Sequence, residues 1–337
     1  MTLMNSNRIL YIFCLCALAL LDIGCSRPVY RNAQGMVWNT TYNITYEADT
    51  DLSDSVIAEL KRVERSVSAF DPSSVVSLIN RNESDVTDFL FRQVYNTAVE
   101  VNRLSGGAFD PTLAPLINAW GFGYEKTETP DSAQIREILQ YIGIEKTSLE
   151  HGRLNKQDPR IQFNFSAIAK GFGCDCVGAM FERLGVDNYM VEIGGEIRMG
   201  GKNPKGAKWN ISIDKPIFSA DSEIHESQTV LPLTDCGMAT SGNYRNFKEI
   251  DGKRVVHTID RFTGCPALND LLSVTVIVPA SKTVTAPCML ADALATACMS
   301  MGSEKAKAMI ESQGFAALFI LADGTIWQSP RLLSLTR

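Results

Sequence analysis

The sequence has few of the groups on which common enzyme classes depend. Its 337 residues include three histidines, His151, His225 and His257, and the cysteine spacings match no zinc-binding pattern. The nucleotide-binding patterns GxGxxG and GxxxxGK[ST] are absent, as is the GxSxG turn of α/β-hydrolases. No basic run stands out, and the formal net charge is −6. A nucleic-acid partner, which would require clustered Lys and Arg, is therefore not expected.

The N-terminus has the form of an export signal. Arg8 precedes an apolar run from Ile9 to Leu21, which is short for a membrane span and typical of a signal peptide. The run ends at Asp22-Ile23-Gly24-Cys25, which resembles the processing site of bacterial lipoproteins, although Asp22 stands where Leu is usual. We expect residues 1–24 to be a lipoprotein-type signal peptide, Cys25 to carry the lipid, and residues 25–35 to form a polar tether. An ordinary secretory signal is the alternative.

Export would place the chain in an oxidising compartment, where disulfides can form. Cys14 and Cys16 would leave with the signal. The cysteines that follow Cys25 are Cys174, Cys176, Cys236, Cys265, Cys288 and Cys298. We interpret most of these as small buried side chains, and the sequence leaves open whether any pair is bridged.

The periodicity of apolar residues predicts a mixture of helices and strands. Helices are predicted at Asp54–Ser68, Phe89–Ser105, Ser166–Leu184, Ala291–Met301 and Glu304–Gln313. Strands are predicted at Trp38–Glu47, Ile161–Phe165, Tyr189–Ile193, Trp209–Ile213 and Ser273–Val278, with a closing hairpin of Ala316–Leu321 and Thr325–Gln328. Since no regular βαβ rhythm is present, an α+β fold is favoured over a doubly wound sheet.

The stretch from Ser241 to Pro266 is predicted to contain a hairpin turned at Asp251-Gly252, because such a dipeptide adopts the turn that matches strand twist. The returning strand leads to His257 and Asp260. If the chemistry requires an imidazole, His257 is the candidate. From spacing alone, a histidine that only packs across the hairpin is an equally good interpretation.

Asp292 and Thr296 stand four residues apart in a predicted helix, so they share a face. Their oxygens are of the hard type that Mg²⁺ prefers. Taken alone, an Asp near a helix start is more often a cap or a partner of the helix dipole. A second candidate is the loop Ser105–Thr112, in which Asp110 follows two glycines whose backbone can approach a phosphate closely; a tight turn without a ligand is the alternative.

Together, these stretches resemble the ApbE family of flavin transferases. The matching segments occur in family order between Trp38 and about Gly302. They are W-N-T-T-Y, S-A-F-D-P-S-S-V-V-S-L-I-N, S-G-G-A-F-D-P-T, W-G-F-G, A-I-A-K-G, V-E-I-G-G-E-I, S-G-N-Y-R, H-T-I-D-R-F-T-G-C-P and A-D-A-L-A-T-A.

The resemblance implies an α+β domain of mixed sheets with flanking helices over residues 36–337, which binds FAD and Mg²⁺. It implies an enzyme that moves FMN from FAD to a Thr or Ser hydroxyl of an acceptor flavoprotein, a subunit of a membrane redox complex, and releases AMP. The implied location is a bacterial membrane, reached through the lipid anchor, on the inner membrane facing the periplasm. Two alternatives are an FAD pyrophosphatase that yields FMN and AMP, and a non-catalytic, lipid-anchored FAD-binding protein.

The resemblance also implies site residues. The metal ligands would be Asp292, Thr296 and the backbone carbonyl of Ala167. The flavin nucleotide would contact Phe70, Ala108, Phe109, Asp110, Asn164, Lys170, His257 and Thr258. His257 is expected to be the catalytic base or to orient a phosphate, with Asp260 or Asp110 as its rival.

This chain departs from the family pattern at a few positions. Asn164 stands where many members have Asp, Arg261 where Pro is usual, and Trp38-Asn39 where Met-Gly is common. An amide at position 164 can donate and accept hydrogen bonds, but it cannot act as a base. If that position must ionise, the enzyme would be slow or inactive.

Overall fold

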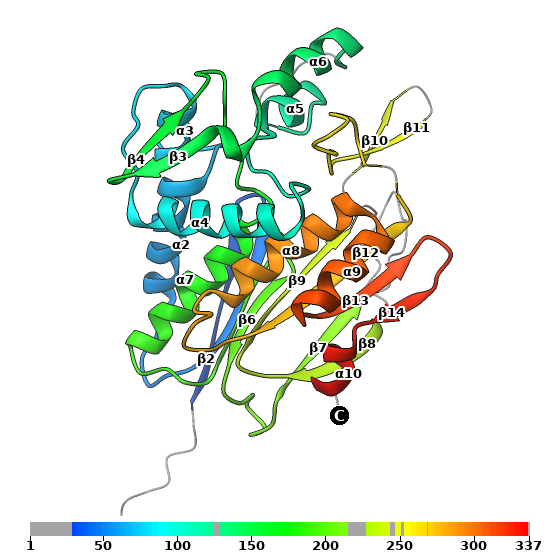
Figure 1. Ribbon diagram of the computed structural model, residues 1–337. Coiled ribbons are helices and arrows are strands. Elements are labelled where there is room, and N and C mark those ends of the chain that lie inside the picture. The colour runs from blue at the N-terminus through cyan, green and yellow to red at the C-terminus, as the bar shows by residue number, and fades with distance from the viewer. Residues whose placement is uncertain are drawn as a thin grey trace, which may run out of the picture.

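An eight-stranded sheet forms the centre of the computed structural model, which describes residues 29–123, 129–214, 227–242, 247–250, 253–267 and 269–335. Its strand order is β1-β2-β5-β6-β9-β12-β13-β14, and each neighbouring pair is antiparallel (Figure 1). The predicted α+β class is thereby confirmed. The predicted signal peptide with Cys25, and the Asp251-Gly252 turn, lie outside the described residues.

Five of the strands in this sheet match predicted strands, and the other three, at residues 30–37, 196–200 and 236–242, were not predicted. They are β1 (Tyr30–Val37), β2 (Thr40–Glu47), β5 (Tyr189–Ile193), β6 (Glu196–Gly200), β9 (Cys236–Gly242), β12 (Leu271–Pro279), β13 (Ala316–Leu321) and β14 (Ile326–Gln328). One difference concerns the predicted tether at residues 25–35, because its second half belongs to β1. Trp38 and Asn39, predicted to open a strand, instead form the β1–β2 turn with φ of 48° and 59°. Positive φ at both central residues is the geometry of a tight hairpin turn.

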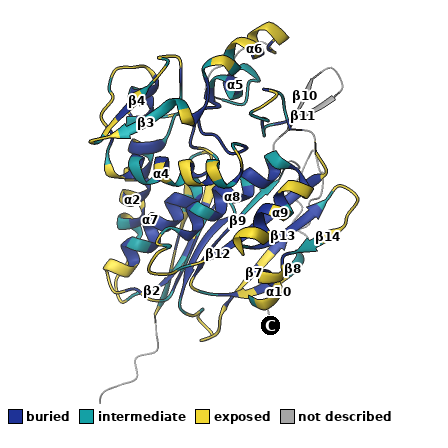
Figure 2. Ribbon diagram, in the orientation of Figure 1, coloured by how far each residue is buried: buried dark blue, intermediate teal, exposed yellow. Residues whose placement is uncertain are grey.

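Both faces of the sheet are covered. Helices α7 (Ala169–Arg183), α8 (Pro287–Met301) and α9 (Ser303–Gln313) pack on one face (Figure 1). The hairpin of β7 (Trp209–Asp214) and β8 (Ser227–Leu233), with α10 (Pro330–Leu335), supplies the apolar layer on the other face. The strands between these layers are largely buried (Figure 2). Val276 and Ile277, consecutive residues of β12, are both buried and enter different apolar clusters.

Of the remaining elements, α2 (Ser53–Val67) lies beside α7 in the helical layer, and the others lie beyond one end of the sheet (Figure 1). The others are α3 (Val75–Asn80), α4 (Phe89–Leu104), α5 (Ala114–Ala119), α6 (Ser132–Tyr141), the 3₁₀ helix η1 (Ile144–Lys146), and the strand pairs β3 (Thr147–Glu150) with β4 (Arg153–Lys156) and β10 (Phe247–Ile250) with β11 (Lys253–Val256). Pairing of Ile250 with Lys253 confirms the hairpin predicted within Ser241–Pro266.

The predicted strand at Ile161–Phe165 is wrong. Ile161, Phe163 and Phe165 are buried in the main apolar cluster, as their alternation suggests. However, the Asn80 side chain, and not a neighbouring strand, forms hydrogen bonds with the backbone of Phe163. The Asn80 amide donates to the Phe163 carbonyl (2.8 Å) and accepts from the Phe163 N–H (2.7 Å). One amide side chain therefore satisfies the backbone groups that a ladder would otherwise pair.

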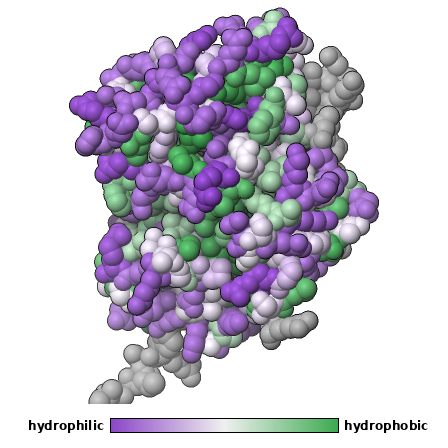
Figure 3. All heavy atoms as spheres, viewed as in Figure 1, coloured by the Kyte–Doolittle hydropathy of each residue, from purple (hydrophilic) through white to green (hydrophobic). Residues whose placement is uncertain are grey.

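The surface in view is mostly hydrophilic, and hydrophobic side chains gather near its top, where α5 and α6 lie (Figure 3). Within the described part of the chain, no helix has both the length and the apolar character needed to cross a bilayer. The cysteines after Cys25 are free thiols. All are buried except Cys265, which is half-buried. Their interpretation as small buried side chains is confirmed.

Candidate active site

A cavity of about 340 Å³ lies where α8, the first turn of α7 and several loops meet. Most of the residues predicted for the site line it: Ala108, Phe109, Asp110, Asn164, Ala167, Lys170, His257, Thr258, Asp292 and Thr296. They come from segments far apart in the sequence, and the fold brings them to one place. Glu196, Ser241 and Phe122 also contribute to the lining.

Asp292 lies within the second turn of α8, because the helix begins at Pro287. A proline is favoured at this first helical position because it has no N–H to lose. Asp292 is buried, and its Oδ2 accepts the N–H of Gly171 on α7 at 2.9 Å. A Cβ on Gly171 would lie 2.4 Å from the Cys288 carbonyl oxygen, so glycine permits this close approach. Asp292 is therefore not a cap of its own helix.

The ammonium group of Lys170 lies between two buried carboxylates. Its Nζ is 2.7 Å from Glu196 Oε1 and 4.0 Å from Asp292 Oδ1. Burial alone would lower the pKa of Lys170, but the two carboxylates outweigh burial and raise its pKa above the usual value. Burial raises the pKa of both Asp292 and Glu196, and the ammonium opposes this. Lys170 is thus held charged in the cavity.

Sequence reasoning missed Glu196. It is the first residue of β6, it is 2% exposed, and it lines the cavity. Its Oε2 has no hydrogen-bond partner among the described residues. A buried oxygen without a partner costs stability unless a ligand completes it. The V-E-I-G-G-E-I segment was noticed, but it contains two glutamates, and spacing did not show which of them faces the site.

Thr296 lies one turn after Asp292 on α8, and both side chains line the cavity. The hydroxyl of Thr296 is 3.2 Å from the hydroxyl of Ser241, at the end of β9. Ala167 lies on the cavity wall just before α7. The cavity is therefore lined by all three residues predicted as metal ligands, namely Asp292, Thr296 and Ala167.

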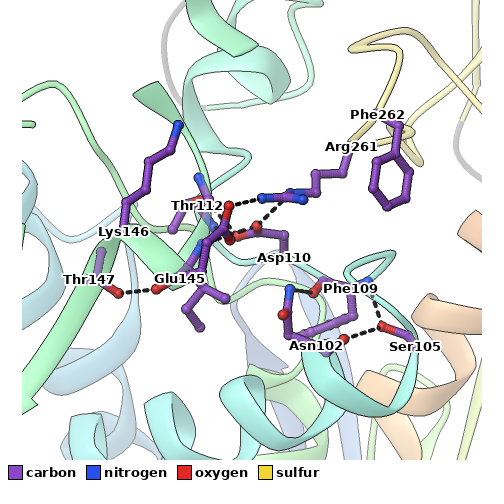
Figure 4. Close-up of polar contacts among 12 residues, drawn as sticks. Asn102, Ser105, Phe109, Asp110, Thr112, Glu145, Lys146, Thr147, Arg261 and Phe262 are labelled. Carbon is purple, nitrogen blue, oxygen red and sulfur yellow. Dashed lines mark hydrogen bonds and ion pairs between the residues drawn. The ribbon is translucent and has the colours of Figure 1, made fainter. Parts of the chain in front are cut away.

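Asp110 is a buried link between chain segments (Figure 4). Its Oδ1 accepts the backbone N–H of Thr112 (2.8 Å) and the Thr112 hydroxyl (2.7 Å), and its Oδ2 accepts from Ile144 N (3.2 Å) and Arg261 Nε (3.1 Å). Burial raises the pKa of Asp110, while Thr112 and the Arg261 guanidinium lower it. These contacts engage both oxygens, so the prediction of Asp110 as a catalytic base gains no support.

His257 and Thr258 line the cavity directly after β11. The imidazole meets the Phe122 ring edge to face, with ring centroids 6.5 Å apart. The Thr258 carbonyl accepts the N–H of Ala267 at 2.8 Å, which closes the loop that follows. Of the histidines named in the sequence, His257 is the one in the cavity lining; His151 is an exposed turn residue, and His225 lies outside the described residues.

Two predicted residues do not line this cavity. Asp260 accepts the backbone N–H groups of Phe262 (2.7 Å) and Thr263 (3.3 Å), so its carboxylate is engaged in closing a turn. The structure places this carboxylate outside the cavity lining, and its catalytic role stays an untested prediction. Phe70 is 55% exposed and borders a separate cavity of about 530 Å³ with Gln162 and Gly123.

Asn164 lines the cavity. Its side-chain oxygen accepts the N–H of Ser166 at 2.8 Å, and its own N–H donates to the Pro111 carbonyl at 2.8 Å. An amide oxygen accepts such a bond as a carboxylate oxygen would. The observed role of Asn164, which shapes the loop before α7, does not require an ionised side chain.

Comparison with known proteins points to one family. A model of the ApbE family matches residues 38–319. The chain is 36% identical over 304 residues to a protein of Haemophilus influenzae named FAD:protein FMN transferase, with 85% of each chain covered. It is 37% identical over 314 residues to a protein of the same name from Vibrio cholerae, with 90% of this chain and 91% of that protein covered.

Solved structures agree with this. The flavin transferase ApbE from Vibrio cholerae superposes with a TM-score of 0.80 at 33% identity, covering 91% of this chain and 99% of that chain. The apo form of the Pseudomonas stutzeri flavinyl transferase ApbE also gives a TM-score of 0.80, at 28% identity, over 94% of this chain and 100% of that chain.

The carboxylates around Lys170 lead to a stability prediction for Lys170→Met. The variant should lose about 2 kcal/mol of unfolding free energy at pH 8, less than a fully buried pair would lose, because Lys170 is partly exposed. At pH 5 the loss should fall below about 1 kcal/mol, because Glu196 without its ammonium takes up a proton. In the unchanged protein the Lys170 contribution is present at both pH values, since both lie below its unfolded pKa of about 10.4.

Urea unfolding at the two pH values measures this difference. Lys305→Met, at an exposed position of α9, is the matched control and should change stability little at either pH. Equal losses at pH 5 and pH 8 for Lys170→Met would show that the carboxylates do not depend on the ammonium.

Proposed function

This chain belongs to the ApbE family, and from that membership and the cavity described above we propose that it transfers FMN from FAD to a hydroxyl group of an acceptor protein. AMP is the second product. The two relatives that are 36% and 37% identical to it over the aligned residues carry this activity in their name. The chain spans nearly the full length of these relatives, so the proposal concerns the whole domain.

The observation that carries the proposal is the grouping of Lys170, Glu196 and Asp292 in one cavity with the hydroxyl of Thr296. FAD carries its negative charge on a diphosphate. An ammonium that is held charged by buried carboxylates can face such a group at fixed geometry. Phosphoryl-type transfer relies mainly on positioning and charge stabilisation, so few ionisable residues are required.

The residues also fit a magnesium ion. Among the described residues, Asp292 Oδ1 accepts no hydrogen bond and Glu196 Oε2 is buried without a partner. No three His, Cys, Asp or Glu side chains of the described part gather into a cage, which suits a cation that keeps water and substrate phosphate as ligands. Asp292, Thr296 and the Ala167 carbonyl would hold Mg²⁺. When bound, the ion would neutralise diphosphate charge and polarise the phosphorus that is attacked.

The reaction forms one bond and breaks one. The acceptor hydroxyl oxygen attacks the phosphorus of the FMN half, the bond from that phosphorus to the bridging oxygen breaks, and AMP leaves with the bridging oxygen. The hydroxyl proton needs an acceptor, and we assign this role to His257, the imidazole in the cavity lining. Lys170 orients the diphosphate, and the loop Ala108–Asp110 forms the wall beside it.

We also propose that the protein is exported and anchored by a lipid on Cys25. The support is the sequence alone, in which a short apolar run is followed by a small residue and a cysteine. The location implied is the outer face of the inner membrane, where the acceptor would be a flavoprotein subunit of a membrane redox complex. Release of the Cys25→Ala variant from membranes into the soluble fraction would support the anchor, and unchanged membrane retention would oppose it.

One assay tests the function directly. The purified protein is incubated with FAD, Mg²⁺ and an acceptor flavoprotein domain that carries a Thr or Ser hydroxyl, and the acceptor is then denatured. We expect flavin fluorescence on the denatured acceptor band, together with free AMP. Free FMN with an unlabelled acceptor would indicate hydrolysis, and intact FAD would indicate a binding protein. Either of those results would overturn the proposal.

Asp292→Asn tests the metal site with little change of shape, because an amide oxygen can still accept the Gly171 N–H. Loss of the charge should lower the transfer rate about a hundredfold and require about tenfold more Mg²⁺ for half-maximal activity. A magnesium titration of the rate measures both. Asp323→Asn, in the exposed β13–β14 turn, is the matched control, and coincident titration curves for all three proteins would contradict the assignment.

His257→Ala tests the proton acceptor. The transfer rate at saturating FAD should fall about 10² to 10⁴-fold, the usual contribution of a positioned acid or base. The dissociation constant of FAD should change much less, since the main charge contact is Lys170. Stopped-flow transfer and flavin fluorescence titration give the two quantities. A variant that transfers FMN at the normal rate would exclude this role.

A further inference from the structure

The loop that carries His257 forms a closed unit from residue 257 to residue 267, referred to below as the His257 loop. Ile259 forms a β-bridge with Pro266, the Asp260 N–H donates to the Cys265 carbonyl at 2.8 Å, and the Asp260 carboxylate closes the turn between them. Such a unit can move as one piece. The position of His257 in the cavity therefore depends on the contacts that hold this loop against the rest of the protein.

Apolar contacts hold one side of the loop. Ile259 packs with Leu113, Leu116 and Ile135 of the cluster beneath α5 and α6. The indole N–H of Trp120 donates to the Gly264 carbonyl at 2.8 Å. These contacts place the loop on α5 and α6, and the cavity wall at Ala108–Asp110 lies just before Leu113 and α5 in the chain.

Arg261 adds a charged contact between the loop and this wall (Figure 4). Its Nε lies 3.1 Å from Asp110 Oδ2, and its Nη2 forms an ion pair with Glu145. The Asp110 side chain is fully buried, that of Arg261 is 18% exposed and that of Glu145 is 54% exposed. The inner pair is therefore shielded from solvent, and such a pair constrains geometry more than a surface pair does.

The space around the guanidinium group is built to receive it. A Cβ on Gly143 would lie 2.8 Å from Nη2, and one on Gly107 would lie 3.4 Å from Nη1. Gly143 has φ of 132°, a conformation that other residues rarely adopt. The Gly143 N–H donates to the Thr112 hydroxyl at 2.7 Å, and that hydroxyl donates to Asp110. Arg261 thus enters a network that already fixes the Asp110 carboxylate.

We propose that Arg261 is a positioning residue that sets the distance between the His257 loop and the wall of Ala108–Asp110, and so places His257 and Thr258 against the flavin nucleotide. This inference rests on the proposed function for its consequence in catalysis. The expected effect of Arg261 on FAD binding does not depend on the proposed function, because the His257 loop and Ala108–Asp110 both line the cavity. Arg261 acts through the position of the His257 loop, and it is not among the residues that line the cavity.

A purely structural role for Arg261 would predict a different result. In that case Arg261→Met would lower stability, and its effect on transfer would be the same whether or not His257 is present. If Arg261 acts by placing His257, the two substitutions are not additive, because a histidine that has been removed cannot be misplaced. A double-mutant cycle separates the two cases.

The experiment uses the full chain with Arg261→Met, Arg261→Lys, His257→Ala and the double variant Arg261→Met/His257→Ala. The matched control is Arg160→Met, whose guanidinium pairs with Asp158 and Glu137 and lies over the Tyr141 ring, away from the cavity lining. Kd for FAD is measured by flavin fluorescence, kcat and KM are measured for FMN transfer, and Tm is measured for every protein.

We expect Arg261→Met to weaken FAD binding about tenfold and to lower kcat about ten- to a hundredfold, because small displacements of reacting groups have effects of this size. Arg261→Lys, which retains the charge but not the planar fork, should recover part of the loss. In the His257→Ala background, Arg261→Met should lower kcat less than threefold further. Arg160→Met should leave Kd and kcat unchanged.

Three results would overturn the inference: an Arg261→Met protein with the Kd and kcat of the unchanged protein, a full effect of Arg261→Met in the His257→Ala background, or an equal effect of Arg160→Met. If Arg261→Met does not fold, Arg261→Lys provides the same comparisons. Failure of the proposed function is seen separately, as an unchanged protein that labels no acceptor, and the FAD titration then still tests Arg261.

Discussion

The close packing of α7 against α8 is the constraint on which the site depends. Each helix bonds the backbone of the other through a carboxylate. Asp292 of α8 accepts the N–H of Gly171 at 2.9 Å, and Asp175 of α7 accepts the N–H groups of Cys288 and Met289 at 3.2 and 2.7 Å. Asp175 thus serves the free donors in the first turn of α8, where a negative charge also suits the helix dipole. These two links fix the position of α8 along its axis and its rotation about that axis, so that Asp292 and Thr296 face the cavity.

Charge pairing explains how so many ionisable groups are buried near one another. Burial raises the pKa of Asp110, Glu196 and Asp292, and each carboxylate has a cationic group nearby. An ion pair of this kind is seldom more stable than an apolar replacement. Its retention is better explained by the geometry it imposes. The orphan oxygen of Glu196 supports this view, because a core selected for stability alone would not leave a buried acceptor without a partner.

The sequence predicted most elements because apolar periodicity is a local property. The strand Tyr189–Ile193 is found with its predicted bounds. The errors arise where a distant segment decides the outcome. Nothing near Phe163 indicates that Asn80 will satisfy its backbone groups. From spacing alone, Asp292 was interpreted as a helix cap. The sequence of α8 does not reveal that Gly171 of α7 packs against it. Glu196 was missed for the same reason, since it lies on strand β6 and its partner Lys170 lies on helix α7.

The site must also discriminate between a protein hydroxyl and water, and the geometry limits how it can do so. Water is smaller than any side chain, so the cavity cannot exclude it by size, and both nucleophiles attack the same phosphorus. Binding contacts with a substrate half that is common to both reactions favour neither. Discrimination must then come from the position of the catalytic base. The base must face the direction from which the hydroxyl of the bound protein substrate approaches. The position of His257 is set by a loop held between an apolar cluster and the Arg261–Asp110 pair. If His257 accepts the proton, as proposed, the balance between transfer and hydrolysis depends on how rigidly Arg261 and the apolar cluster hold that loop.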